Sequence, residues 1–151
     1  MGRSFRLWAT ACVCLIVAAP ALGQQQVAAG HVKVTSGEAV IIRAGNTVPV
    51  KTGLAVYQAD VLRTGKDGRV GLIFRDDTQV SIGPQSEVRL DSFMYEPAEG
   101  HLSLALNFIR GVAVYVSGRI AKLAPDAVRL ETPASILGVR GTTLALQVAS
   151  E

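Results

Sequence analysis

The sequence predicts an all-β protein, a single compact sandwich or roll of short strands. Apolar and polar residues alternate with a period of two in run after run of the chain. Glycine, proline, asparagine and aspartate gather between these runs, as turns require. No segment after residue 23 shows an apolar stripe with the 3.6-residue period of a helix. Sandwiches, rolls and short β-helical coils all fit this pattern, and periodicity does not choose among them.

The first half of the chain supplies five expected strands, each with an apolar face. In chain order the apolar residues of these strands are Val32 and Val34, Val40 and Ile42, Val70, Leu72 and Phe74, Val80 and Ile82, and Val88 and Leu90. Turn chemistry separates them at Gly45-Asn46, Lys66-Asp67-Gly68, Asp76-Asp77 and Gly83-Pro84. Such alternation is typical of half-buried strands, and it places Phe74 in the core.

The second half continues the pattern with four further strands. Their apolar residues are Leu102, Leu104, Leu106 and Phe108, then Val112, Val114 and Val116, then Val128 and Leu130, and finally Leu144, Leu146 and Val148. The expected turns lie at 97–100, Gly118 and Pro125-Asp126. No low-complexity linker divides these strands, so residues 24–151 are expected to form one domain.

The first 23 residues are expected to be a cleaved signal peptide. Arg3 and Arg6 precede an apolar run from residue 7 to residue 19, Pro20 ends that run, and small residues follow up to Gly23. The run is shorter than the about 20 residues of a membrane span, so no stable membrane span is expected. This predicts export to a bacterial periplasm or secretion.

Removal of this leader changes the composition of the chain. Both cysteines lie in residues 1–23, so no disulfide is expected in the mature protein. Of the 15 basic residues two also leave, and the rest nearly balance the 12 acidic residues. A balanced charge gives no electrostatic reason to expect nucleic-acid binding.

Spaced glycines, aspartates and threonines give the chain a resemblance to a known family. The motif near the C-terminus, residues 132–142, is the most specific: Thr-Pro is followed by Gly-Val-Arg-Gly-Thr. Together these elements resemble the periplasmic domain family named after FecR, a ferric-citrate uptake regulator. The residues that match its structural motif are Gly53, Asp60, Gly65, Asp76, Thr78, Thr132, Pro133, Gly138, Gly141 and Thr142.

The resemblance implies a module for protein contacts and signal reception. Asp77 stands where the family usually has a turn glycine, and aspartate tolerates the left-handed conformation that such a turn needs. The resemblance implies that full-length regulators of this kind also contain a sigma-factor-binding segment and a membrane span. In this sequence the expected cleavable leader stands in their place. Direct anti-sigma activity is therefore not expected.

Arg140 is the most prominent cation of the C-terminal motif. In a Gly-Val-Arg-Gly turn, its guanidinium can bind the carboxylate of a partner in a bidentate manner. The alternative, which we favour on sequence grounds, is an internal ion pair with Asp60 or another turn carboxylate.

Phe93, Met94 and Tyr95 form the aromatic cluster expected to reach solvent. They directly precede a turn, and aromatic residues and methionine suit a contact with another protein. The alternative is a loop that folds these side chains back over an open end of the sheet.

Enzyme chemistry is not expected. His31 and His101 are isolated imidazoles, no nucleophile elbow is present, and no cysteine remains after processing. Convergent metal ligands are also missing from the sequence pattern, so no metal or cofactor is expected.

The functional prediction is a periplasmic module for protein recognition or signal sensing in the cell envelope, with another envelope protein as its partner. Two alternatives stay open: binding of a cell-envelope glycan, which usually requires exposed aromatic rings, and a structural β-domain. Exposed strand edges offer a further route to partners, through added main-chain hydrogen bonds.

Overall fold

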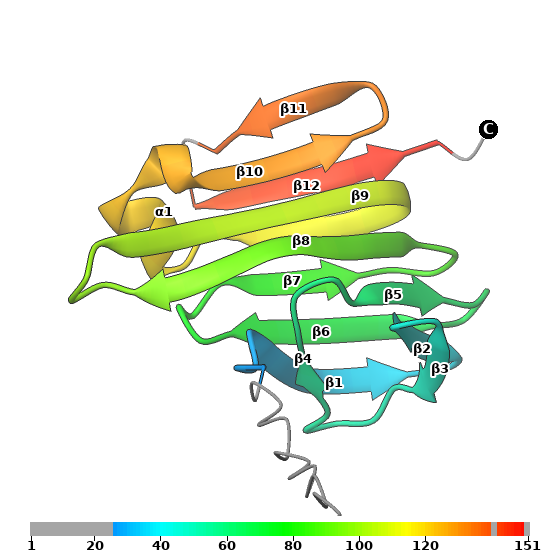
Figure 1. The fold of residues 1–151 in the computed structure, drawn as a ribbon. Helices are drawn as coiled ribbons and strands as arrows, with labels where there is room; N and C mark the ends of the chain where they lie inside the picture. The colour runs from blue at the N-terminus through cyan, green and yellow to red at the C-terminus, as the bar shows by residue number, and fades with distance from the viewer. Residues whose placement is uncertain (1–25, 140–141, 150–151) are drawn as a thin grey trace, which may run out of the picture.

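The all-β prediction is confirmed by a computed structural model of the chain, which describes residues 26–139 and 142–149 (Figure 1). In these residues twelve strands form one continuous sheet that curls on itself, and α1 (Arg119–Leu123) is a short helix beside it. The predicted leader, residues 1–23, lies outside the described residues. None of the helices in the described part of the chain has the length and apolar character that membrane crossing requires.

Strand β9 (His101–Val116) connects the two halves of the curled sheet, which we call sheet A and sheet B. Its C-terminal half belongs to sheet A, whose other strands are β4 (Ala55–Val56), β1 (Gly30–Ser36), β6 (Arg69–Phe74), β7 (Gln79–Ile82) and β12 (Thr143–Val148). Its N-terminal half belongs to sheet B, whose other strands are β3 (Asn46–Pro49), β2 (Ala39–Arg43), β5 (Val61–Thr64), β8 (Glu87–Glu96), β10 (Val128–Thr132) and β11 (Ser135–Gly138). The pairing of β9 with β10 is parallel, and the other pairs are antiparallel.

The core lies between the inner faces of the two sheets, where the apolar positions of the alternating strands meet. Phe74 and Phe108 are buried there, as predicted. The largest fully buried side chains are Tyr115, Phe108, Ile41, Leu62, Ile82, Leu90, Leu104, Leu106, Ile120 and Leu130. Burial of a side chain of this size contributes about 2–3 kcal/mol, so this interior is the main source of stability.

Three β-bulges change which residues face the core, and alternation alone does not reveal them. In β8, Leu90 pairs with Leu106 but Ser92 pairs with Ala105, so Asp91 is an extra residue. In β1, Val32 pairs with Leu72 but Val34 pairs with Gly71, so Lys33 is an extra residue and Val34 turns outward. In β9 a similar irregularity precedes Gly111, which has a φ of 93°. Beyond it the buried positions are Ala113 and Tyr115 rather than the valines on either side.

Val34, Val112 and Val114 are therefore exposed, where simple alternation would bury them. Their exposed fractions are 59%, 40% and 39%. A one-residue insertion moves all following side chains to the opposite face of a strand, because successive side chains alternate. All three valines lie on the outer face of sheet A, the face turned away from the core.

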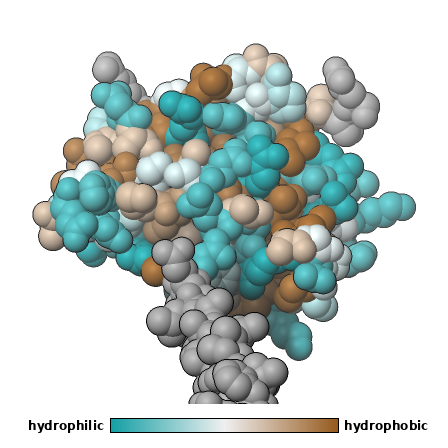
Figure 2. Space-filling model, viewed as in Figure 1, coloured by the Kyte–Doolittle hydropathy of each residue, from teal (hydrophilic) through white to brown (hydrophobic). Residues whose placement is uncertain are grey.

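The outer face of sheet B is polar and carries paired charges. Arg63 and Arg110 lie on either side of Glu87 in neighbouring strands and contact it at 3.0 Å and 3.3 Å. Arg89 contacts Asp91 on the same strand. In the view of Figure 1 the surface shows mostly polar residues with apolar residues scattered among them (Figure 2).

Tyr115 gives the fold a testable dependence on alkaline pH. Burial raises the pKa of its hydroxyl above the ordinary value of 10.0, and the neighbouring side chains of Ser117 and Thr78 lower it by less. The Tyr115 hydroxyl ionises at a lower pH in the unfolded chain than in the folded protein. Its contribution to the free energy of unfolding is therefore complete below pH 10 and is lost as the pH rises through the folded-state pKa.

We expect the free energy of unfolding to fall above pH 10, and a 295 nm absorbance titration to show a late tyrosine step. In Tyr115→Phe that late step should be missing. A titration curve with the same late step in this variant would contradict the assignment.

Candidate functional site

The turn between β6 and β7 is held by the buried carboxylate of Asp76. Its two oxygens accept hydrogen bonds from the backbone N–H of Thr78 at 3.1 Å, from the Thr78 hydroxyl at 2.7 Å and from the backbone N–H of Ile120 at 3.2 Å. Asp77 between them has a φ of 67°, the left-handed conformation predicted for this residue. The turn is thus fastened to helix α1, which lies about forty residues later in the chain.

Gly118 lies directly over this turn and brings the end of β9 against it. Its N–H donates to the Thr78 hydroxyl oxygen at 3.2 Å, and the N–H of Arg119 donates to the Asp76 carbonyl at 2.7 Å. A Cβ at Gly118 would lie 2.3 Å from the Thr78 nitrogen, so only glycine fits. We call Asp76, Thr78, Gly118 and Ile120 the turn–helix knot.

Asp60 forms a second buried knot, with Arg43 as its charged partner among the described residues. Its carboxylate accepts two bonds from the Arg43 guanidinium at 2.8 Å and 2.7 Å, and one from the Tyr57 N–H at 2.8 Å. The Arg43 guanidinium also lies 4.5 Å from the centre of the Tyr57 ring. The hydrogen bond and charge of Asp60 raise the pKa of Arg43.

On sequence grounds we favoured a pair of Arg140 with Asp60 or another turn carboxylate, and the structure gives Asp60 a different partner, Arg43. The carboxylate of Asp60 is 1% exposed and already engaged by three donors, so it is occupied by Arg43. Arg140 itself, together with Gly141, lies outside the described residues. The sequence feature that could have indicated this pair is an arginine, Arg43, at the end of strand β2, from which its side chain reaches the β4–β5 connection.

The remaining motif residues occupy turns and strand ends. Gly65 donates its N–H to the Glu38 carbonyl at 2.8 Å, and Gly53 has a φ of 85°. The Thr132 hydroxyl accepts the N–H of Ser135 at 3.1 Å across the exposed β10–β11 turn that contains Pro133. Gly138 ends β11, and Thr142 is an exposed residue whose carbonyl accepts the N–H of Ser117 at 2.8 Å.

Phe93, Met94 and Tyr95 lie in strand β8 rather than in a loop, and strand alternation divides them. The Phe93 ring stacks on Phe74 with its centre 5.5 Å away, and Tyr95 is half-buried. Met94, on the opposite face, is 47% exposed. The expectation that the whole cluster reaches solvent therefore holds for Met94 alone among the three, because the bulge at Asp91 turns Phe93 and Tyr95 toward the core.

Two arginines accompany Tyr95 at this end of the molecule. Arg119 contacts the Asp77 carboxylate at 2.8 Å, and its pKa is raised by a hydrogen bond with the Tyr95 side chain and then by Asp77. Arg75 donates to the Tyr95 carbonyl at 3.2 Å. We call Met94, Tyr95, Arg75 and Arg119 the hairpin-end surface, which takes Met94 from one face of β8 and the other three residues from around Tyr95 on the other face.

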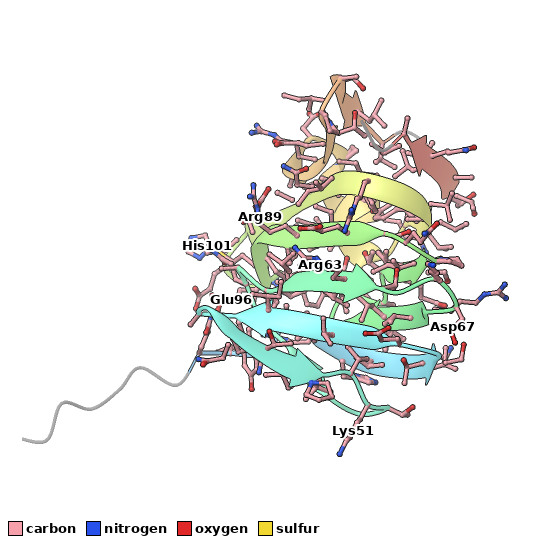
Figure 3. The ribbon with its side chains drawn as sticks, turned by 90° about the vertical axis from the view of Figure 1, so that its right-hand side faces the viewer. Lys51, Arg63, Asp67, Arg89, Glu96 and His101 are labelled. Carbon is pink, nitrogen blue, oxygen red and sulfur yellow. The ribbon has the colours of Figure 1, made fainter. Side chains whose placement is uncertain are left out.

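The β8–β9 turn also brings together three potential metal ligands that sequence reasoning did not group. Glu96, Glu99 and His101 lie on one turn, with His101 Nδ1 at 3.8 Å and 3.4 Å from the two carboxylates. Figure 3 labels Glu96 and His101 at this end of the molecule. Their signal in the sequence is the short spacing Glu-x-x-Glu-x-His. All three side chains are exposed, which is common for acidic groups without a metal, so we assign them no function.

Comparison with known proteins supplies the family. A family model described as "FecR protein" matches residues 60–151, more than half of the chain. The chain belongs to the FecR family. No curated protein and no solved structure matches it. The match includes Asp60, the turn–helix knot and the hairpin-end surface, while strands β1 to β4 precede it. The FecR resemblance deduced from the sequence motifs is thereby confirmed.

Proposed function

We propose that this FecR-family chain is a periplasmic protein-recognition module that senses a signal in the bacterial cell envelope by contact with another envelope protein. The observation that carries the proposal is the family match over residues 60–151. The signal-peptide pattern that the sequence predicts at residues 1–23 supports export. The module acts without catalysis, through reversible binding of this partner to its surface.

The hairpin-end surface is the contact that we propose for this partner. Met94 offers an exposed, adaptable apolar side chain, and Tyr95 and Arg119 belong to the residue types that dominate protein interfaces. The Arg119–Asp77 pair is exposed, so its arginine can exchange partners at small cost.

The test is crosslinking in intact cells followed by identification of the captured proteins. We expect one reproducible envelope protein, and we expect Met94→Ala with Tyr95→Ala to reduce its capture about tenfold or more. The matched control is Lys51→Ala with Ile136→Ala, because both residues are exposed and lie outside the hairpin-end surface; Lys51 points away from the body of the protein (Figure 3). Capture should be unchanged in this control.

Two outcomes would contradict the proposal. Equal capture by the Met94→Ala, Tyr95→Ala variant and the native protein would remove the hairpin-end surface as the contact. Absence of any reproducible protein, together with tight retention of the chain on cell-wall glycan, would replace protein recognition with carbohydrate binding.

A further inference from the structure

On the outer face of sheet A the residues that line the largest apolar area include a single charged residue, Arg69, in contrast to the ion pairs on the outer face of sheet B. Residues from five neighbouring strands form a row in register across it, and β1, β6 and β7 of these lie side by side in Figure 1. The row consists of Val34, Gly71, Ser81, Val114 and Ala145. A second row beside it contains Arg69, Gly83 and Val112.

These rows enclose a groove of about 700 Å³, within the usual size range of ligand sites. Gly71 and Gly83 form part of its floor, and the side chains of Val34 and Val112 pack over them. A Cβ at Gly71 would lie 2.8 Å from a methyl group of Val34, and a Cβ at Gly83 would lie 2.4 Å from a methyl group of Val112. Glycine inside a strand weakens the strand and often marks close approach of a ligand or another backbone.

Two of the three β-bulges of the fold turn side chains toward this groove. The bulge at Lys33 turns Val34 outward, and the irregularity before Gly111 turns Val112 and Val114 outward. Each of these valines gives up part of the burial that an inward-facing side chain would have. Bulges of this kind commonly redirect side chains toward functional sites.

Charge and polarity describe what the groove can hold. Arg69 is exposed at its margin, and among residues 26–139 and 142–149 no carboxylate lies within ion-pair distance of it or lines the groove. A ligand that fills the groove therefore gains most if it carries a carboxylate opposite Arg69. Ser36, Ser81 and Gln147 also line the groove and can bond with main-chain N–H and C=O groups. A fatty acyl chain has no N–H or C=O groups along its length, so it cannot form these hydrogen bonds, whereas a peptide can.

We propose that this groove binds an extended apolar segment of a partner protein, with a carboxylate of that segment bound to Arg69. This inference rests on the proposed function and adds a second contact, distinct from the hairpin-end surface. The row crosses five strands, or about 19 Å, which accommodates roughly six extended residues. Valines 34, 112 and 114 contact the apolar side chains of the segment, and Arg69 fixes its direction.

The probe is the peptide acetyl-Val-Ala-Val-Ala-Val with a free C-terminal carboxylate, compared with the same peptide as a C-terminal amide. Binding to the purified full chain is measured by calorimetry. We expect the acid to bind about tenfold more tightly than the amide. Arg69→Gln should abolish this difference, and Arg129→Gln, which removes an equally exposed strand arginine from sheet B, should preserve it.

Two further variants test the apolar part of the groove. Val114→Asp should weaken binding of both peptides about tenfold or more, whereas Ile136→Asp, at an exposed apolar residue of β11, should not. Ala145→Leu fills the groove without adding charge and should also block binding, which provides the same test if Val114→Asp fails to fold.

Equal affinity for acid and amide, or full binding by Ala145→Leu, would overturn the proposal. Tighter binding of decanoate than of the peptide, with the same dependence on Arg69, would overturn the peptide assignment in favour of an acyl chain. If Ala145→Leu loses the peptide but cells still crosslink the partner normally, the groove is not the partner contact and the proposed function stands. If crosslinking in cells that express the native protein captures no partner while the peptide binds as expected, the proposed function is wrong and the groove is still a peptide-binding site.

Discussion

Replacement of Asp76 with alanine should lower the free energy of unfolding by about 3–5 kcal/mol. The substitution leaves three donors of the turn–helix knot without their acceptor: the Thr78 N–H, the Thr78 hydroxyl and the Ile120 N–H. Asp76 and Thr78 are both 0% exposed, so water does not replace the lost bonds in the folded state. Each unsatisfied buried donor costs about 1–3 kcal/mol.

The loss is large compared with the total stability of a domain, about 5–15 kcal/mol. It should be measured by urea unfolding followed by far-ultraviolet circular dichroism, because the only tryptophan, Trp8, lies in the predicted leader. Asp77→Gly is the matched control on the adjacent residue. It removes only the exposed pair with Arg119 and suits a φ of 67°, so we expect a change of at most about 1 kcal/mol. Equal unfolding midpoints for Asp76→Ala and Asp77→Gly would contradict the role of the knot.

Replacement of Asp60 with alanine should have the second-largest effect, about 2–3 kcal/mol. The Tyr57 N–H and the Arg43 guanidinium both lose their acceptor. The cost stays below that of a fully buried ion pair because Arg43 is 31% exposed and regains some water. Through Arg43, this knot also connects strand β2 to the β4–β5 connection, so its loss should loosen the N-terminal edge of sheet B.

Urea unfolding again measures the effect, and hydrogen exchange of the β2 and β5 amides locates it. The matched control is Arg63→Gln, which breaks an exposed pair with Glu87 on the same sheet and should cost less than about 1 kcal/mol. If Asp60→Ala proves no more destabilising than Arg63→Gln, or if β2 exchange is unchanged, the Asp60 knot does not hold this edge.

The sequence predicted the class of fold well, because period-two alternation reports local half-burial that does not depend on how the strands are arranged. It also selected Asp60 and Asp76 through the family motif, and it predicted a left-handed turn at Asp77. It did not predict the partner of Asp60. The choice of Arg43 depends on which strands are neighbours, and alternation carries no information about strand order.

The candidate contact residues show the same division. A run of Phe, Met and Tyr before a turn predicts an apolar cluster, but only strand β8 and the Phe74 ring decide that Phe93 packs inward and Met94 does not. The groove on sheet A was not anticipated at all. Glycine inside an alternating strand, as at Gly71, was the available signal for it.

The sequence by itself determined an all-β chain of the FecR family with turns at defined places, since these follow from local patterns and spaced motif residues. The tertiary structure alone decided strand order, the partners of the buried carboxylates and the face on which each valine lies. A bulge adds one residue and reverses every side chain after it, and such a bulge forms only when a neighbouring strand fixes the register. For this reason Val34, Val112 and Val114 meet on one outer face although they are far apart in the chain.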